Sequence, residues 1–294
     1  MIRLAILSDI HGNVPALDAV LDDIAAQHVD EVLVGGDLVG RGPQGSTVVK
    51  RIRRLGFESI GGNHEDYLLA FRRGEIPADW RTTEEWAAAR WMAAELDVED
   101  AAYVEALPFS LARPGLRLVH GTPKSNRQGI GPWTEDAALR RQLGRVEESL
   151  LVCAHTHRPL IRELEDGMIV NVGSVGLPFN RDQRAQYAIF ERGGDGWGVE
   201  PRQVAYDLRE ILRIYETSGF LAAGGVTARL LRLELEHATP LLVPFIEWTR
   251  ATGVDASIRR LDDFFAVFQP GQSIRDFFRD LRSASATKDD RRMR

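Results

Sequence analysis

The sequence contains a single cysteine among its 294 residues, Cys153, and this excludes an intramolecular disulfide. No apolar run approaches the length that spans a bilayer, and no secretory signal pattern opens the chain. The formal net charge of −6 argues against a broad nucleic-acid-binding surface. Internal repeats and long low-complexity segments are also missing. We therefore expect a cytoplasmic protein that has neither a membrane partner nor a broad nucleic-acid surface.

The hydrophobic content of 44% is enough to build a sizeable core. Over the first sixty residues, strand and helix patterns alternate, which predicts a parallel sheet with crossover helices. Two hairpins are expected later, at residues 160–172 and 186–204, and they suggest a second sheet packed on the first. The sequence thus predicts an α/β (α+β) fold with two sheets.

The pattern becomes helical after about residue 207. We expect a catalytic domain over residues 1–206, a helical C-terminal extension over 207–282 and a disordered tail over 283–294. The extension has two candidate roles. It either packs on the sheet or forms a homo-oligomer, or it is a cap that restricts access of the substrate.

Polar side chains follow the predicted strands at the point where each strand ends. Loops at the carboxyl ends of strands commonly carry the functional site in α/β sheets. Five of the seven histidines lie in these clusters. The clusters are Asp9-x-His11, Gly36-Asp37, Asn63-His64, His120-Gly121 and His155-Thr156-His157. Turn chemistry could explain each cluster alone, but it does not explain five of them in order.

These residue types suit a pair of metal ions. Imidazole nitrogen and carboxylate oxygen, without thiolate, are ligands for manganese, iron or zinc. Two metals can hold the attacking and leaving oxygens of an in-line displacement, and a metal lowers the pKa of a bound water toward neutrality. Asp37 is the natural bridging carboxylate. Cys153 lies in an apolar run and is expected to be a small core residue rather than a ligand.

The ordered motifs resemble those of the calcineurin-like metallophosphoesterases over roughly the first two hundred residues. The resemblance implies a two-sheet αββα sandwich and a metal-dependent phosphoric ester hydrolase with two divalent or trivalent ions, manganese being the first choice and iron or zinc the alternatives. It implies one metal held by Asp9, His11, Asp37 and His157, and another held by Asp37, Asn63, His120 and His155. It also makes His64 a catalytic residue that stabilises the transition state and protonates the leaving oxygen.

Two further segments indicate the branch. The loop Gly36–Pro43 is similar to that of Ser/Thr protein phosphatases and symmetrical dinucleoside-tetraphosphate hydrolases. In those enzymes the arginine of the loop binds phosphate, and the resemblance implies the same role for Arg41. The alternative is that Arg41 forms a surface ion pair. The segments at 155–159 and 171–176 resemble small bacterial phosphodiesterases. Together they resemble the bacterial phosphodiesterase and diadenosine-tetraphosphate-hydrolase-like branch.

We therefore expect a small phosphorylated or nucleotide-type substrate, a phosphodiester or a dinucleoside polyphosphate, cleaved by a water that bridges the metals. The alternatives are a phosphomonoesterase like the Ser/Thr phosphatases and a non-catalytic scaffold of the same fold. Lys124 and Arg127 are candidate substrate-binding residues, and with Arg158 and Arg181 they could form a cationic rim or simply solvated loops. The loop at 122–133 is the expected specificity loop.

Overall fold

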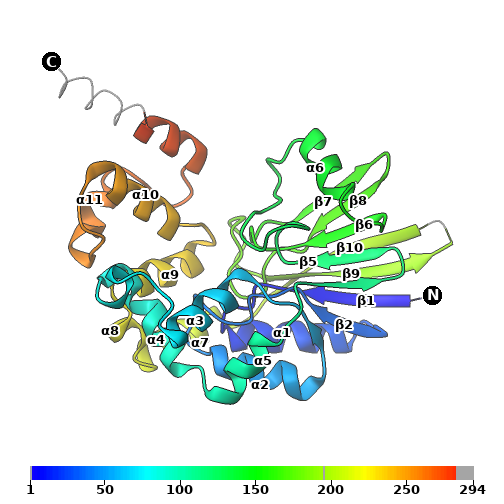
Figure 1. Cartoon of the computed structure of the whole chain (residues 1–294), viewed down its shortest axis with the longest axis horizontal. Coiled ribbons are helices and arrows are strands. Elements are labelled where there is room, and N and C mark those ends of the chain that lie inside the picture. Colours follow the sequence, from blue (N-terminus) through cyan, green and yellow to red (C-terminus); the bar gives the residue numbers. More distant parts are fainter. Residues whose placement is uncertain (1, 195, 283–294) are drawn as a thin grey trace.

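Two five-stranded mixed sheets lie on one side of the molecule in the computed structural model, which describes residues 2–194 and 196–282 (Figure 1). The first has the order β10-β9-β1-β2-β3, with β1 (Ile2–Leu7), β2 (Glu31–Val34), β3 (Glu58–Ser59), β9 (Ala185–Gly193) and β10 (Gly196–Val204). The second has the order β4-β5-β6-β8-β7, with β4 (Ser110–Arg113), β5 (Leu116–Val119), β6 (Leu150–Cys153), β7 (Leu160–Leu164) and β8 (Gly167–Asn171).

Helices cover the outer faces of both sheets and continue beyond them. The α-helices are α1 (Val14–Ala25), α2 (Gly45–Leu55), α3 (Asn63–Arg73), α4 (Ala87–Glu95), α5 (Val98–Glu105), α6 (Asp136–Leu143), α7 (Leu208–Thr217), α8 (Phe220–Ala223), α9 (Gly225–His237), α10 (Leu242–Thr252) and α11 (Leu261–Phe265). Three short 3₁₀ helices are η1 (Asp79–Arg81), η2 (Glu84–Trp86) and η3 (Ile258–Arg260). Residues 274–282 are also helical.

The alternation of side chains along β1 explains the layers. Leu4 and Ile6 point into the core between the two sheets, whereas Ala5 and Leu7 point into the core beneath α1 and α2. On the outer face of the second sheet, Leu139 of α6 packs on the strands. The predicted two-sheet αββα sandwich is confirmed, because each sheet buries one face against the other sheet and one against helices.

The later hairpin differs from the expectation. β9 and β10 do form an antiparallel pair, but β9 also pairs with β1 from Ile2↔Arg192 to Leu7↔Tyr187 and so extends the first sheet. The hairpin at β7 and β8 belongs to the second sheet, as expected. The reason is burial: β9 is buried along most of its length, which an edge hairpin with one covered face would not need.

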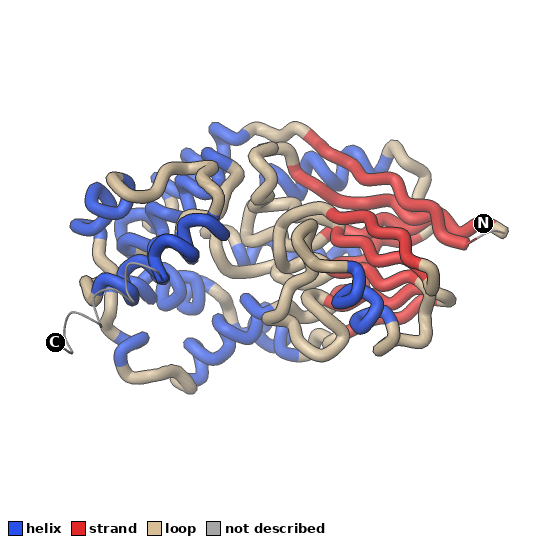
Figure 2. The backbone as a smooth tube through the Cα atoms, turned by 90° about the horizontal axis from the view of Figure 1, so that it is seen from above, coloured by secondary structure: helices blue, strands red, loops and turns tan. Residues whose placement is uncertain are grey.

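The C-terminal helices lie beside the ends of the strands rather than over a sheet (Figures 1 and 2). α9 belongs to two apolar cores at once. Its Leu231 packs in the main core with α1 and α2, while its Leu230 packs in a second core with Phe245 and Phe264. The domain boundary near residue 206 stays a prediction, and the predicted tail lies outside the described residues.

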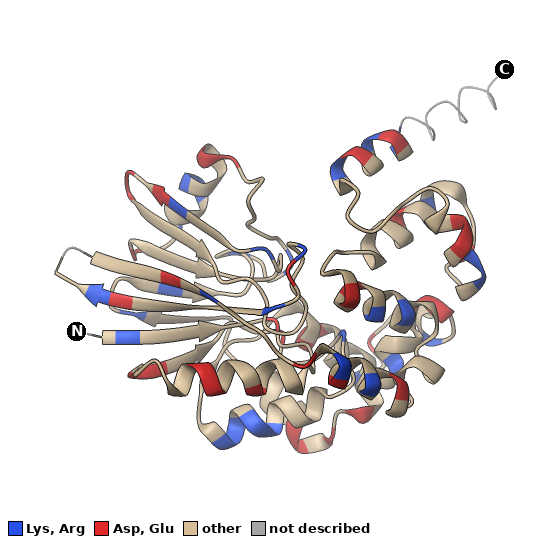
Figure 3. Ribbon diagram, turned by 180° about the vertical axis from the view of Figure 1, so that it is seen from behind, with Lys and Arg blue, Asp and Glu red and all other residues tan. Residues whose placement is uncertain are grey.

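Acidic and basic residues are interspersed along the helices and strands that the structure describes (Figure 3). None of the described helices is long and apolar enough to cross a membrane. The cytoplasmic location and the homo-oligomer through the C-terminal helices stay predictions.

Candidate metal centre

Loops that leave the carboxyl ends of the strands bring the predicted site residues together from distant parts of the chain. The β1 loop carries Asp9 and His11, the β2 loop carries Asp37 and Arg41, and α3 begins at Asn63 just after β3. His120 follows β5, and His155 and His157 follow β6. Because β1 and β2 are parallel, as are β5 and β6, these loops all open at one end of the sandwich.

The first group consists of Asp9, His11, Asp37 and His157, all buried. Asp9 Oδ1 lies 3.3 Å from His157 Nε2 and 3.7 Å from His11 Nε2, and Asp37 Oδ2 lies 3.7 Å from His11 Nε2. The two imidazole Nε2 atoms are 3.1 Å apart. One donor atom from each of the four residues lies within 4.8 Å of the others, a spacing that suits ligands of one ion.

The second group shares Asp37 and adds His120 and His155. Asp37 Oδ2 lies 3.3 Å from His120 Nε2, and Asn63 Oδ1 lies 3.1 Å from that same nitrogen. Asn63 therefore completes a second set of oxygen and nitrogen donors. Since Asp37 belongs to both groups, its carboxylate is placed where a bridging ligand would lie.

The two carboxylates are held so that one oxygen of each faces the centre without a hydrogen bond. The backbone N–H of His155 donates to Asp9 Oδ2, and the backbone N–H of His64 donates to Asp37 Oδ1. Among the described residues, Asp9 Oδ1 and Asp37 Oδ2 are buried without a hydrogen-bond donor. Buried carboxylate oxygens are costly when they are unsatisfied, so this arrangement fits metal ions bound between the two groups.

Three of the imidazoles are oriented through their other ring nitrogen. The Nδ1 atoms of His11, His120 and His157 lie within hydrogen-bond distance of the carbonyl oxygens of Val39, Gly35 and Leu177, respectively. An N–H at Nδ1 that donates to a backbone carbonyl leaves the lone pair on Nε2. This is the usual way in which a protein fixes the tautomer of a metal-binding histidine.

The electrostatics of the centre depend on burial. Burial lowers the pKa of His11 well below its ordinary value and lowers that of His155 to about 4. Burial also opposes protonation of His120, but the Asp37 carboxylate outweighs it and raises the pKa to about 10. At neutral pH, His11 and His155 are therefore in the neutral form that binds metal.

The loops reach this arrangement through strained backbone. Non-glycine residues with left-handed φ include Asp9 (53°), His11 (51°), Asp37 (53°), His155 (65°) and His157 (56°). Each such residue costs of order 1–3 kcal/mol and persists only where the surroundings impose it. Strain in five of the seven predicted ligands is a mark of a functional site rather than of ordinary turns.

Glu65 stabilises the β2 loop through hydrogen bonds and is not among the site residues predicted from the sequence. Its buried carboxylate accepts hydrogen bonds from the backbone N–H groups of Asp37, Leu38, Val39 and Gly62 at 2.7–3.2 Å. Burial raises the pKa of Glu65 to about 7. The sequence signal was its place in Gly62-Asn63-His64-Glu65, three residues into α3, where a Glu side chain commonly turns back to the helix N-terminus.

His64 lies at the open side of the centre, with its ring centroid 5.0 Å from that of His11. It packs directly on Gly40, where an added Cβ would lie 2.5 Å from His64 Nδ1. Gly40 also has a φ of 79°, which only glycine adopts readily. Burial lowers the pKa of His64 to about 3.

Arg41 is held beside His64 by residues of the C-terminal extension. Its Nε donates to His64 Nε2 at 3.2 Å and its Nη1 donates to Glu234 Oε2 at 2.9 Å. Tyr215 Oη donates to the backbone carbonyl of Arg41 at 2.7 Å. The alternative of a surface ion pair does not describe this contact, because Glu234 is fully buried. Nη2 makes no hydrogen bond among the described residues and is free to bind an anion.

Glu234 stands outside every motif of the sequence. Its other oxygen, Oε1, accepts from the backbone N–H groups of Leu241 and Leu242 at 2.7 and 2.8 Å. The available signal was its spacing: Val226, Leu230 and Glu234 are four residues apart, so a carboxylate interrupts the apolar face of α9.

The two candidate substrate residues of the specificity loop do not join this cluster. Lys124 is exposed, and its side chain forms no ion pair or hydrogen bond among the described residues. The Arg127 guanidinium lies 4.9 Å from the Tyr67 ring centroid and 4.0 Å from the Asp66 carboxylate. Tyr67 is itself next to His64, with ring centroids 5.9 Å apart, so Arg127 lies at the outer edge of the site.

Comparison with known proteins gives a family match over most of the chain. Residues 2–194 match the calcineurin-like phosphoesterase superfamily domain. A crystal structure of a metallophosphoesterase from Sphaerobacter thermophilus superimposes with a TM-score of 0.66 and 27% sequence identity, covering 81% of this chain and 99% of that chain.

Two curated sequences add to the match. The uncharacterized protein MJ0912 of Methanocaldococcus jannaschii is 26% identical over 228 residues, which is 70% of this chain and 89% of that protein. The symmetrical bis(5'-nucleosyl)-tetraphosphatase of Baumannia cicadellinicola is 39% identical over 71 residues, which is 23% of this chain and 25% of that protein. The second match thus spans only a quarter of the tetraphosphatase.

Proposed function

The chain belongs to the calcineurin-like phosphoesterase superfamily, a family of metal-dependent phosphoric ester hydrolases, and from that premise we propose that it hydrolyses a phosphodiester or phosphoanhydride of a small nucleotide-type substrate. The observation that carries the proposal is a pair of carboxylate oxygens without hydrogen-bond donors, Asp9 Oδ1 and Asp37 Oδ2. They face imidazole nitrogens at the carboxyl ends of the strands.

We assign one metal to Asp9, His11, Asp37 and His157, and the other to Asp37, Asn63, His120 and His155. When bound, such a metal pair supplies an activated water and neutralises phosphate oxygens. Manganese is our first choice, with iron or zinc as alternatives, because every donor is nitrogen or oxygen. Burial of Cys153 within β6 raises the pKa of its thiol, so it offers no thiolate.

His64 and Arg41 act on the phosphate from the protein side. The Arg41 guanidinium is held beside His64 through its Nε and Nη1 atoms, which leaves the Nη2 donors of this planar charged fork for phosphate oxygens. His64 is neutral near pH 7 in the absence of ligand, and its Nε2 then accepts from Arg41. The negative charge of a bound phosphate raises the pKa of His64, and once the phosphate takes over the Arg41 contact, protonated His64 donates to the departing oxygen.

A dinucleoside polyphosphate or phosphodiester is preferred to a phosphomonoester because the loops after β6 and β8 continue beyond the centre into a large cleft. The partial match to a tetraphosphatase supports the same substrate class.

The test is a substrate panel with manganese-loaded protein. It compares bis(p-nitrophenyl) phosphate, p-nitrophenyl phosphate, cyclic AMP, diadenosine tetraphosphate and a phosphopeptide. We expect turnover of the diesters or of the tetraphosphate, loss on chelation and loss in His64→Ala. Fastest turnover of the phosphopeptide would indicate a phosphatase instead, and hydrolysis that His64→Ala leaves unchanged would contradict the assigned role.

A further inference from the structure

A cleft of about 1330 Å³ lies between the sandwich and the C-terminal helices. It begins at the metal centre, since His155 and Thr156 line it, and so does Phe179, whose ring stacks on His157 with centroids 4.6 Å apart. The far wall is formed by Thr239, Pro240 and residues 271–275 of the extension. Binding sites for small molecules usually measure ~300–1,000 Å³, so this cleft has room for much more than one phosphate group.

Hydrogen bonds fix the two walls relative to each other. The backbone N–H of Arg181 donates to Ala238 O at 2.9 Å, and the Arg181 side chain donates to the carbonyl of Gly271. Arg181 and Ala238 both have left-handed φ, at 66° and 46°. The Arg41–Glu234 ion pair joins the same two parts of the chain. The relative position of the two walls of the cleft is therefore fixed by these contacts.

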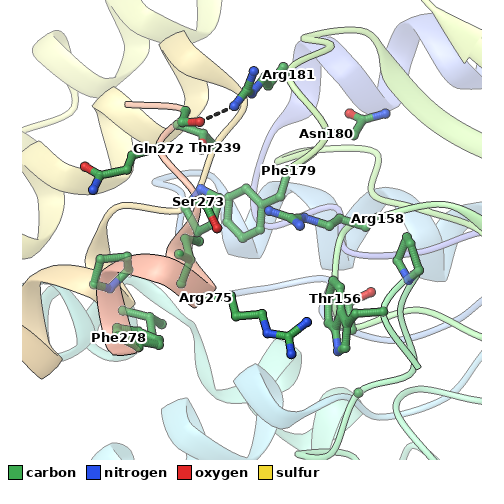
Figure 4. Close-up of a pocket in the computed structure, with 18 of the residues that line it drawn as sticks. Thr156, Arg158, Phe179, Asn180, Arg181, Thr239, Gln272, Ser273, Arg275 and Phe278 are labelled. Carbon is green, nitrogen blue, oxygen red and sulfur yellow. Dashed lines mark hydrogen bonds between the residues drawn. The ribbon is translucent and has the colours of Figure 1, made fainter. Parts of the chain in front are cut away.

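The cleft is positively charged although the chain carries a net charge of −6. Its lining contains Arg158, Arg181, Arg275 and Arg282 against one acidic residue, Glu135. Figure 4 shows Arg158 and Arg275 reaching into the cleft from opposite walls. Among the described residues, neither of these two forms an ion pair, and partial burial together with the nearby Arg181 lowers the pKa of Arg158. Unpaired guanidinium groups that face one another are arranged for an anion.

Aromatic surface accompanies the charge. The Trp133 side chain is 59% exposed, and the Arg158 guanidinium lies 5.4 Å from its ring centroid. Phe278 lines the opposite wall. Exposed aromatic rings beside arginines are typical of surfaces on which nucleobases stack.

We infer that this cleft binds the nucleoside-polyphosphate arm of the substrate beyond the scissile phosphate, with Arg158 and Arg275 on its phosphates and Trp133 against its base. This rests on the proposed function. The specificity of the enzyme would then depend on the C-terminal extension, which supplies Arg275 from outside the residues that match the family.

The test compares the double variant Arg158→Ala/Arg275→Ala with a matched control, Arg54→Ala/Arg229→Ala. The control also removes two arginines that form no ion pair among the described residues, but these are exposed on α2 and α9 outside the cleft. The specificity ratio, kcat/KM for diadenosine tetraphosphate over kcat/KM for bis(p-nitrophenyl) phosphate, should fall about tenfold or more in the cleft variant because two charge-assisted hydrogen bonds are lost. It should stay within twofold in the control.

If the wild type hydrolyses the small diester and the cleft variant keeps the wild-type specificity ratio, the cleft assignment is overturned and the proposed function still stands. If the wild type hydrolyses neither substrate, the proposed function fails, and binding decides on the cleft. For that, α,β-methylene-ADP is titrated into each protein in a calorimeter. Affinity at least tenfold weaker in the cleft variant than in the control supports the assignment, and equal affinities overturn it.

A third variant distinguishes a nucleotide from a plain polyphosphate. Trp133→Ala should weaken binding of α,β-methylene-ADP about tenfold and leave binding of inorganic tripolyphosphate within twofold, because only the nucleotide has a base to stack. Equal effects on the two ligands would overturn the nucleotide assignment.

Discussion

The metal centre and the neighbouring cleft are built on opposite principles. In the centre, six of the seven assigned ligands are buried, and backbone groups orient several of them, such as the carbonyls that face the Nδ1 atoms of His11 and His120. In the cleft, Arg275 is exposed and Arg158 is only partly buried, and neither has a carboxylate partner among the described residues. The centre is made rigid by short contacts, whereas the cleft keeps its charges available for a ligand.

The difference separates chemistry from specificity. Preorganised ligands hold a constant geometry for hydrolysis of any phosphate ester, and small errors there are costly. We expect substitutions of the cleft arginines and of Trp133 to cost the fold less, so these residues can determine which substrate is accepted. Arg41 belongs to both regions, because it reaches the centre from the β2 loop and is held by Glu234 of α9.

The largest effect should follow from crowding the bridging carboxylate. In Gly62→Ala, the new Cβ would lie 2.1 Å from Asp37 Oδ1, whereas in Gly61→Ala the nearest atom, Leu107 Cβ, is 3.8 Å away. Neither glycine has a left-handed φ, so the two substitutions differ in the crowding of Asp37 and not in backbone strain. We expect Gly62→Ala to lose about 100-fold in metal affinity and in turnover, and Gly61→Ala to match the wild type. Titration with metal gives the metal affinity of each variant, and an activity assay gives its turnover. Equal metal affinity in the two variants would mean that Asp37 is not held as described.

A loss of turnover of similar size, but without loss of metal, should follow from removal of the phosphate-binding guanidinium. Arg41→Ala should reduce kcat/KM about 100-fold while metal content stays at the wild-type level, because the loss is in stabilisation of phosphate charge. Arg41→Lys should recover only part of the activity, since an ammonium group lacks the planar fork. Elemental analysis together with steady-state kinetics measures both quantities. Unchanged kinetics in Arg41→Ala would remove this residue from the site.

Loss of the charge on Glu234 should act through Arg41. Glu234→Gln keeps an acceptor for Leu241 and Leu242 but weakens the hydrogen bond to Arg41 Nη1, so we expect kcat to fall about tenfold. The melting temperature should fall as well, because breaking a buried ion pair costs about 3–5 kcal/mol. Glu236→Gln, on the same helix but paired with Arg232 at its surface, is the matched control.

A double-mutant cycle decides whether Glu234 positions Arg41 or merely stabilises the fold. In an Arg41→Ala background, Glu234→Gln should change kcat less than twofold, because the residue that it positions is gone. A full tenfold loss in that background would show that the effect on activity is independent of Arg41.

The smallest effects are expected at the outer edge of the site. Lys124→Ala and Arg127→Ala should each raise KM about two- to threefold without changing kcat, because exposed charges contribute ~0.2–1 kcal/mol. Steady-state kinetics with diadenosine tetraphosphate gives both constants. A tenfold rise in KM for either variant would move the substrate path from the cleft to the Tyr67 side of the centre.

The contrast between the regions also explains what could be predicted from the sequence. Asp9, His11 and the other members of the centre follow strands that are recognisable by their apolar runs, so local patterns placed them at one end of a sheet. Their convergence required only that neighbouring strands be parallel, as β1 and β2 are. The two-sheet sandwich was predictable for the same reason, together with the family resemblance.

Features that depend on distant packing were not predictable in this way. The pairing of β9 with β1 joins residues 180–190 positions apart, from Leu7↔Tyr187 to Ile2↔Arg192. Glu234 meets Arg41 across 193 positions, with only a break in the apolar face of α9 to mark it. The cleft needs the extension to dock on the loops after β6 and β8, and no local pattern encodes that docking.

The most direct measurement of the central claim is the metal content of wild-type protein and of Asp37→Asn, determined by elemental analysis after loading with manganese and removal of free ions. The substitution keeps the shape of the side chain and removes the charge that both groups share. The account predicts two equivalents per chain in the wild type and loss of both in the variant. Retention of both metals in Asp37→Asn, or a wild type that binds none, would contradict it.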